Sequence, residues 1–181
     1  MKRANGLIVV ENAKDWYNGV DRNPWLLSRC DTILHKSLKA VDQSFEYYDV
    51  TQSFDLAIHY WELANKVTGG AEVLYCEFIG ARLPMYSVDL HGKISEKCEF
   101  LGWDYSWING DFYSCIYNDL SLKKELFTSY LHILNKYGLF QTENEVDDFI
   151  RRRKKLKRLH PKEMFEVGRF YKVKVFRTII L

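Results

Sequence analysis

The sequence has no C-x-x-C pair, no H-E-x-x-H segment, no G-x-S-x-G elbow and no glycine-rich phosphate loop. Zinc sites, serine hydrolases and nucleotide-binding folds depend on such motifs, so these functions have no support in the sequence. The five histidines are dispersed, and no cysteine stands at metal-ligand spacing from one of them. We therefore expect no metal site and no cofactor. Four cysteines are expected to be reduced thiols: Cys30, Cys76, Cys98 and Cys115.

Long hydrophobic runs are also missing. The N-terminal region has only four consecutive apolar residues, Leu7–Val10, which are too few for the core of a signal peptide. No segment approaches the roughly 20 apolar residues of a membrane-spanning helix. These two absences predict a cytoplasmic protein that makes no membrane contact.

The chain lacks an excess of charge of one sign. Lys and Arg together number 26 against 24 Asp and Glu, which gives a net charge of +2. Such a balance does not make the whole surface attractive to nucleic acid. Aromatic residues, in contrast, are abundant at 15% of the sequence. They must fill a core or form a binding surface.

Apolar residues recur at spacings of three and four, which predicts about four helices. The clearest stripe spans Phe54–Val67 and ends at Gly69-Gly70, because glycine adopts the left-handed conformation after a helix without a clash. Another helix should begin at the capping box Thr142-x-x-Glu145 and stop at His160-Pro161. The remaining stripes cover residues 26–41 and 122–137, the latter closed by Gly138.

Period-two alternation and short apolar runs predict strands around these helices. Short connections between the consecutive strands in the middle favour antiparallel neighbours and hence a meander. Gly102 indicates a bulge or a close backbone approach in its strand. Lys172 and Lys174, alternating with valines in the last strand, are typical of a sheet edge. The expected strands are Leu7–Glu11, Glu72–Ile79, Met85–Leu90, Lys97–Trp107, Asp111–Asn118 and Phe170–Leu181.

The predicted element order is therefore β-α-α-β-β-β-β-α-α-β. Consecutive strands with helices gathered on either side favour an α+β fold over a doubly wound parallel sheet. We expect a single domain, residues 1–181, in which a mainly antiparallel sheet of about five to six strands is covered by about four helices.

The segment Glu99–Leu120 is the strongest candidate for a functional surface. Its Asn109-Gly110 pair tolerates positive φ at both central positions of a type I′ turn and so predicts a tight hairpin. Exposed Trp and Tyr side chains anchor protein interfaces, whereas the alternative is that these aromatics only fill a core between helix and sheet. The candidate partner contacts are Trp103, Asp104, Tyr105, Trp107, Asp111 and Tyr113.

The same segment resembles a pattern found in small bacterial immunity proteins of contact-dependent and other polymorphic toxin systems. The resemblance rests on Phe100-Leu101-Gly102-Trp103-Asp104, then a turn, then Phe112-Tyr113-Ser114 and Asn118. It covers about 20 of the 181 residues. It implies a non-catalytic protein that neutralises a cognate toxin domain by occluding its active site. The near-neutral charge implies a toxin that need not be a basic nuclease.

A second candidate surface is the basic run from Arg151 to Arg158, with seven positive charges in eight residues. It fits a solvated helix face stabilised by the pairs Asp147–Arg151 and Asp148–Arg152, an acidic protein partner, or nucleic acid, in that order of preference. We treat it as a secondary basic patch formed by Arg151, Arg152, Arg153, Lys154, Lys155, Lys157 and Arg158.

Other functions remain open as alternatives. The basic run would serve a nucleic-acid-binding protein. A small hydrolase or nuclease would need Asp89, His91 and Asp104 to converge in a cleft. A phage-encoded inhibitor of a host defence complex would look much like an immunity protein in sequence.

Overall fold

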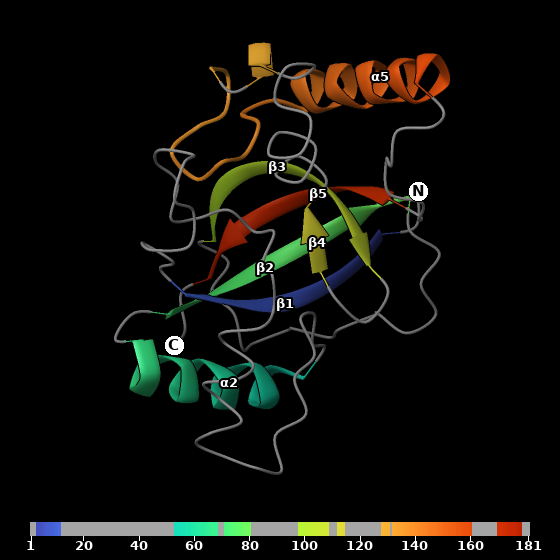
Figure 1. Cartoon of the computed structure of the whole chain (residues 1–181). Coiled ribbons are helices and arrows are strands. Elements are labelled where there is room, and N and C mark those ends of the chain that lie inside the picture. The colour runs from blue at the N-terminus through green and yellow to red at the C-terminus, as the bar shows by residue number, and fades with distance from the viewer. Residues whose placement is uncertain are drawn as a thin grey trace.

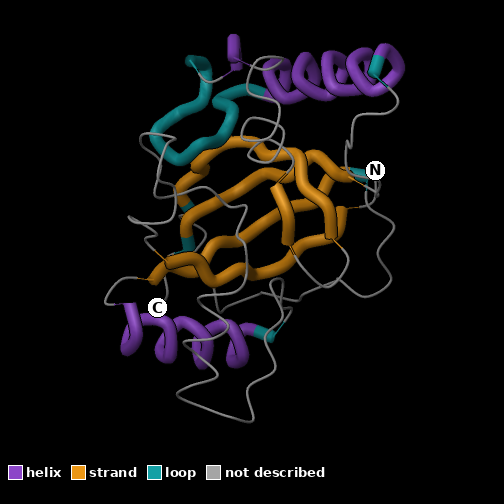
Figure 2. Tube along the Cα trace, in the orientation of Figure 1, coloured by secondary structure: helices purple, strands orange, loops and turns teal. Residues whose placement is uncertain are grey.

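The computed structural model describes residues 3–11, 53–68, 71–80, 98–108, 112–114, 128–130, 132–160 and 170–178. Its centre is a five-stranded antiparallel sheet in the order β1-β2-β5-β3-β4, shown in Figures 1 and 2. The strands are β1 (Arg3–Glu11), β2 (Ala71–Ile79), β3 (Glu99–Ile108), β4 (Phe112–Ser114) and β5 (Phe170–Arg177). The helices are α2 (Phe54–Thr68) and α5 (Glu143–Leu159).

The expected α+β class with an antiparallel sheet is confirmed, but the expected counts and order of elements are not matched. In the described part of the chain the order is β-α-β-β-β-α-β. The helix expected over residues 26–41 and the strand expected over Met85–Leu90 lie outside the described residues.

The last strand, β5, is central, and this overturns two expectations. It pairs antiparallel with β2 on one side and with β3 on the other. The predicted meander is therefore wrong, because β2 and β3 are separated by the strand that comes last in sequence. The predicted edge position of the strand with Lys172 and Lys174 is wrong as well. Both lysines find partners on a covered face of the sheet, as described below.

One face of the sheet carries both helices at different places. Helix α2 covers the β1–β2 end, where Leu7, Val9 and Val73 pack with Ala57 and Tyr60. Helix α5 covers the β3–β5 end. The cross-strand register places Leu7, Tyr75, Phe176 and Phe100 on this same face, so a single face runs from one helix to the other. Figure 1 shows α2 below β1 and α5 above β3.

The opposite face forms a separate apolar cluster. Leu74, Cys76 and Phe78 of β2 pack there with Val173 and Val175 of β5. All five side chains are at most 1% exposed. Tyr137 and Leu139, which belong to the segment after residue 131, complete the cluster from the side of β3.

Thr128–Tyr130 is helical, but residues 132–140 form turns where the helix expected over residues 122–137 should continue; residues 122–127 and 131 lie outside the described residues. The Asn135 side chain explains the change, because its Oδ1 accepts from the backbone N–H groups of Tyr137 and Leu139 at 2.9 and 3.2 Å. Asparagine side chains compete in this way with helical hydrogen bonds. In the described part of the stripe, the apolar spacing therefore reflects burial on two sides of the sheet, not one helical face.

This turn segment closes against the irregular part of β3. Phe140 and Trp103 exchange two backbone hydrogen bonds of 2.8 and 3.0 Å, and Asn135 Nδ2 donates to the carbonyl of Leu101 at 2.7 Å. The register of β3 against β5 shifts between Phe100 and Gly102. The prediction of a bulge or close approach at Gly102 is confirmed in both respects.

Substitution of Gly102 by alanine should cost much more stability than the same change at Gly80. Both glycines have positive φ, +150° and +79°. A Cβ at Gly102 would lie 2.7 Å from Leu139 Cβ and from the carbonyl oxygen of Phe140, whereas one at Gly80 would have no atom within 4 Å. We expect Gly102→Ala to lower the free energy of unfolding by about 3 kcal/mol and Gly80→Ala by about 1 kcal/mol. Urea denaturation of both variants measures this; equal losses would contradict the close approach.

Candidate functional site

Helix α5 begins at the predicted capping box. The backbone N–H of Glu145 donates to Thr142 Oγ1 at 3.3 Å, and the N–H of Thr142 donates to Glu145 Oε2 at 2.9 Å. The helix ends at Leu159, where the N–H of His160 donates to the carbonyl of Leu156 at 2.8 Å. Both predicted ends of this helix are confirmed.

The inner side of α5 is anchored by apolar residues and one arginine. Val146, Phe149 and Leu156 are at most 3% exposed and pack in one cluster with Trp103 and Phe140. Edge-to-face and tilted contacts among the rings give this cluster a defined geometry.

Arg153 belongs to this inner side. It is only 6% exposed, and its guanidinium carbon lies 4.7 Å from the centroid of the Phe170 ring. A buried guanidinium over an aromatic face is a favourable cation–π contact. The structure therefore removes Arg153 from the predicted basic patch and makes it part of the packing between α5 and β5.

Lys172 of β5 fixes the first turns of α5. Its Nζ lies 2.6 Å from Glu143 Oε1 and 2.9 Å from Asp147 Oδ1. Burial alone would lower the pKa of Lys172, but the hydrogen bonds that its ammonium donates to Glu143 and Asp147 outweigh this effect and raise the pKa. Lys172 and Lys174 also lie over the Trp103 ring, at 5.9 and 5.1 Å from its centroid.

The expected ion pairs within α5 are replaced by others. Asp147 pairs with Lys172 of the sheet, and Asp148 pairs with Arg151, three residues on, at 3.2 Å. Asp148 also accepts a hydrogen bond of 2.7 Å from the Tyr130 hydroxyl. This hydrogen bond, followed by the one from Arg151, lowers the pKa of Asp148.

The outer side of α5 carries the remaining cations. Arg151, Lys154, Lys155 and Arg158 stand at positions i, i+3, i+4 and i+7 and so share one helical face. Together with Leu159 they line a hollow of about 350 Å³. We call the four cationic side chains the cationic face. Arg152 and Lys157 are also exposed but do not line the hollow.

The hairpin residues that were expected to contact a partner lie mostly in the interior where the structure describes them. Trp103 is 6% exposed and Asp104 is fully buried. Tyr105 is half-buried, packs on the α5 cluster and meets the Phe170 ring at 5.5 Å. The expectation that Trp103 and Asp104 are accessible contacts is therefore wrong: one face of β3 is covered by α5 and the other belongs to the core.

The remaining hairpin residues are placed only in part. Trp107 of β3 and Tyr113 of β4 are directly opposite each other in the antiparallel pairing, which confirms the hairpin. Their side chains and the whole of Asp111 lie outside the described part of the structure.

The proposed acid–base group is likewise only partly described. Asp89 and His91 lie outside the described residues, and Asp104 is buried beside Ser106 on β3. The backbone N–H of Tyr105 donates to Asp104 Oδ1 at 2.6 Å. Burial, and then the nearby Asp104 charge, raise the pKa of the Cys76 thiol well above its ordinary value. Among the described residues no group of three or more His, Cys, Asp or Glu side chains is arranged to hold a metal ion.

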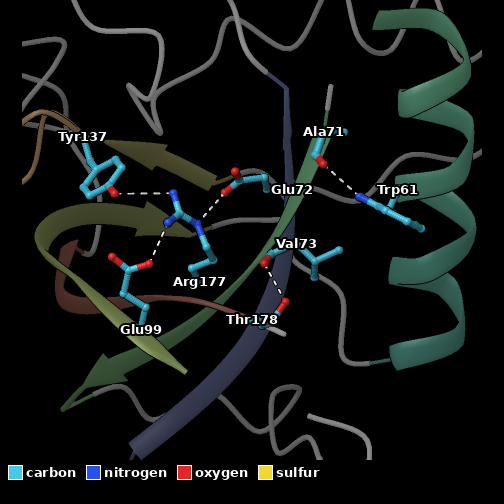
Figure 3. A network of polar contacts seen from close by, with 8 residues as sticks. All are labelled: Trp61, Ala71, Glu72, Val73, Glu99, Tyr137, Arg177 and Thr178. Carbon is cyan, nitrogen blue, oxygen red and sulfur yellow. Dashed lines mark hydrogen bonds and ion pairs between the residues drawn. The ribbon is translucent and has the colours of Figure 1, made fainter. Parts of the chain in front are cut away.

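Sequence reasoning missed an ion-pair network at the end of β5, drawn in Figure 3. Arg177 Nε lies 3.0 Å from Glu72 Oε2 and its Nη1 lies 2.6 Å from Glu99 Oε2, while Nη2 donates to the Tyr137 hydroxyl at 3.5 Å. Burial lowers the pKa of Arg177, but the bonds to Glu72 and Tyr137 outweigh it and raise this pKa. The network joins β2, β5, β3 and the turn segment, and only the insertion of β5 brings its members together.

Comparison of the chain with protein-family models, with curated proteins and with solved structures finds no match. Within the part of the chain that the structure describes, the helices are too short or too polar to cross a membrane. The candidate site is thus defined by its own geometry: a helix held firmly on its inner side, with a cationic face on its outer side.

Replacement of Lys172 by methionine should weaken the attachment of α5 more than replacement of Lys174. Both side chains lie over Trp103, but only Lys172 also pairs with Glu143 and Asp147. We expect Lys172→Met to cost about 1 kcal/mol more unfolding free energy than Lys174→Met. Raising the salt concentration should shrink the difference. Chemical denaturation at low and high salt measures both effects, and equal losses would exclude a role for the ion pairs.

Removal of the Tyr130 hydroxyl should lower the free energy of unfolding at neutral pH and have no such effect at high pH. Burial, and then the bond to Asp148, raise the pKa of Tyr130 from 10 to about 12. The protonated phenol thus stabilises the fold below pH 10, and this contribution is lost as pH rises to about 12. We expect Tyr130→Phe to cost about 1 kcal/mol at pH 7. Denaturation midpoints of both proteins should converge between pH 10 and 12; parallel curves would contradict the raised pKa.

Proposed function

We propose that this chain is a non-catalytic binding protein that acts in the cytoplasm and neutralises a cognate toxin domain. The resemblance of the β3–β4 segment to bacterial immunity proteins supports this class. The observation that carries the proposal is the way α5 is presented. Its inner side is fixed by the cluster around Phe149, by Arg153 and by Lys172, while its outer side keeps cationic side chains exposed.

Such a preorganised surface suits an inhibitor. A binder that is already ordered loses little conformational freedom on association, so its contacts translate into affinity more fully. The inhibitor would cover the active site or substrate groove of the toxin without making or breaking bonds. Its contact surface is centred on α5 in this proposal. The buried Trp103 supports that surface from below. In this proposal Trp107, Asp111 and Tyr113 stay candidate hairpin contacts on the strength of the sequence alone.

The protein should protect bacteria from the toxin domain encoded beside its own gene. We expect growth to be rescued when the two are co-expressed, and a stable complex to elute in size-exclusion chromatography. An inactive variant of the toxin should bind equally well, because no turnover is involved, whereas an unrelated toxin should remain lethal. Death of the co-expressing cells, or absence of a complex with the inactive toxin, would contradict the proposed function.

A further inference from the structure

We propose that the hollow on the cationic face of α5 docks an acidic, partly apolar segment of a protein partner. This inference rests on the proposed function and specifies the chemistry of the partner's contact surface. The lining residues are Arg151, Lys154, Lys155, Arg158 and Leu159.

The first step is the geometry of the cations. The first and last of the four cationic positions, Arg151 and Arg158, are seven residues apart in sequence. An α-helix rises about 1.5 Å per residue, so they lie about 10 Å apart along the axis. Each successive residue turns by about 100°, which places this row opposite the buried Phe149, Arg153 and Leu156. The row therefore points away from the core and matches carboxylates carried on a helix or strand of a partner.

The second step is the availability of the charges. Arg151 is paired with Asp148, but its side chain is still 73% exposed. Lys154, Lys155 and Arg158 make no ion pair with any residue that the structure describes. An acidic partner would thus meet cations that are not already neutralised by α5 or by the sheet.

The third step is the choice between a protein partner and a polyanion such as nucleic acid. Leu159 is 62% exposed at the end of the row and lines the same hollow. An exposed leucine contributes little to contact with phosphates, whereas protein interfaces combine apolar centres with arginine. This exposed leucine favours carboxylates next to an apolar side chain.

The test uses the full-length chain and three labelled probes in fluorescence anisotropy. One is a peptide of repeated Glu-Glu-Leu-Glu units, the second its Gln-Gln-Leu-Gln counterpart, and the third a short duplex DNA of the same total charge as the acidic peptide. The lining variant is Lys155→Glu with Arg158→Glu. Its matched control is Arg152→Glu with Lys157→Glu, which makes the same change in net charge outside the hollow. Circular dichroism verifies the fold, and the corresponding glutamine substitutions replace any variant that fails to fold.

We expect the acidic peptide to bind and the glutamine peptide not to bind. The lining variant should bind the acidic peptide about tenfold more weakly than the unmodified chain, since two attractions become repulsions. The control variant should lose much less affinity. Leu159→Ser should weaken binding of the acidic peptide further without changing the salt dependence. Equal effects of the two double variants, or tighter binding of DNA than of the acidic peptide, would overturn the inference.

Neutralisation of the toxin separates this inference from the proposed function. If the lining variant still protects cells as well as the unmodified chain, the docking surface is wrong although the function stands. If the unmodified chain binds the acidic peptide through the hollow but protects no cells, the proposed function fails while the binding chemistry of α5 remains.

Discussion

Strand β5 joins the two halves of the sheet, since it is the hydrogen-bonded neighbour of both β2 and β3. Without it, β1, β2 and α2 would form one unit, and β3, β4 and α5 another. The side chains of β5 reinforce the junction on both faces. Val173 and Val175 fill the apolar cluster, Lys172 reaches α5, and Arg177 connects three strands with the turn segment.

Because β5 is central, its charged side chains need partners within the fold. Lysines in the middle of a sheet would be costly if they were buried without partners. Here Lys172 and Lys174 lie over the Trp103 ring, and Lys172 also pairs with two carboxylates of α5. The same contacts that satisfy the lysines therefore hold the helix in place. The cationic face of α5 is a consequence of this arrangement, because the helix can turn only one side outwards.

Local signals predicted local features well. Short sequence patterns predicted the capping box at Thr142, helix α2, the irregularity at Gly102 and the β3–β4 hairpin. The position of β5 was not, because strand order depends on contacts between residues about 100 positions apart, such as Glu72 with Arg177. The expected continuation of a helix to Tyr137 is wrong for a different reason. Apolar spacing cannot distinguish one buried helical face from a turn that sends Tyr137 and Phe140 to opposite faces of a sheet.

The candidate site likewise combines features that the sequence predicts with features that depend on tertiary packing. The basic run and its helix were visible in the sequence, but the burial of Arg153, Trp103 and Asp104 followed from tertiary packing. The order of the strands has a further bearing on how the molecule is made. While the chain is being synthesised, β2 and β3 emerge long before the strand that will lie between them. Each nascent half thus has an unsatisfied backbone edge that can pair wrongly with another chain. A chaperone that shields those edges until Phe170–Arg177 leaves the ribosome would raise the yield of native molecules.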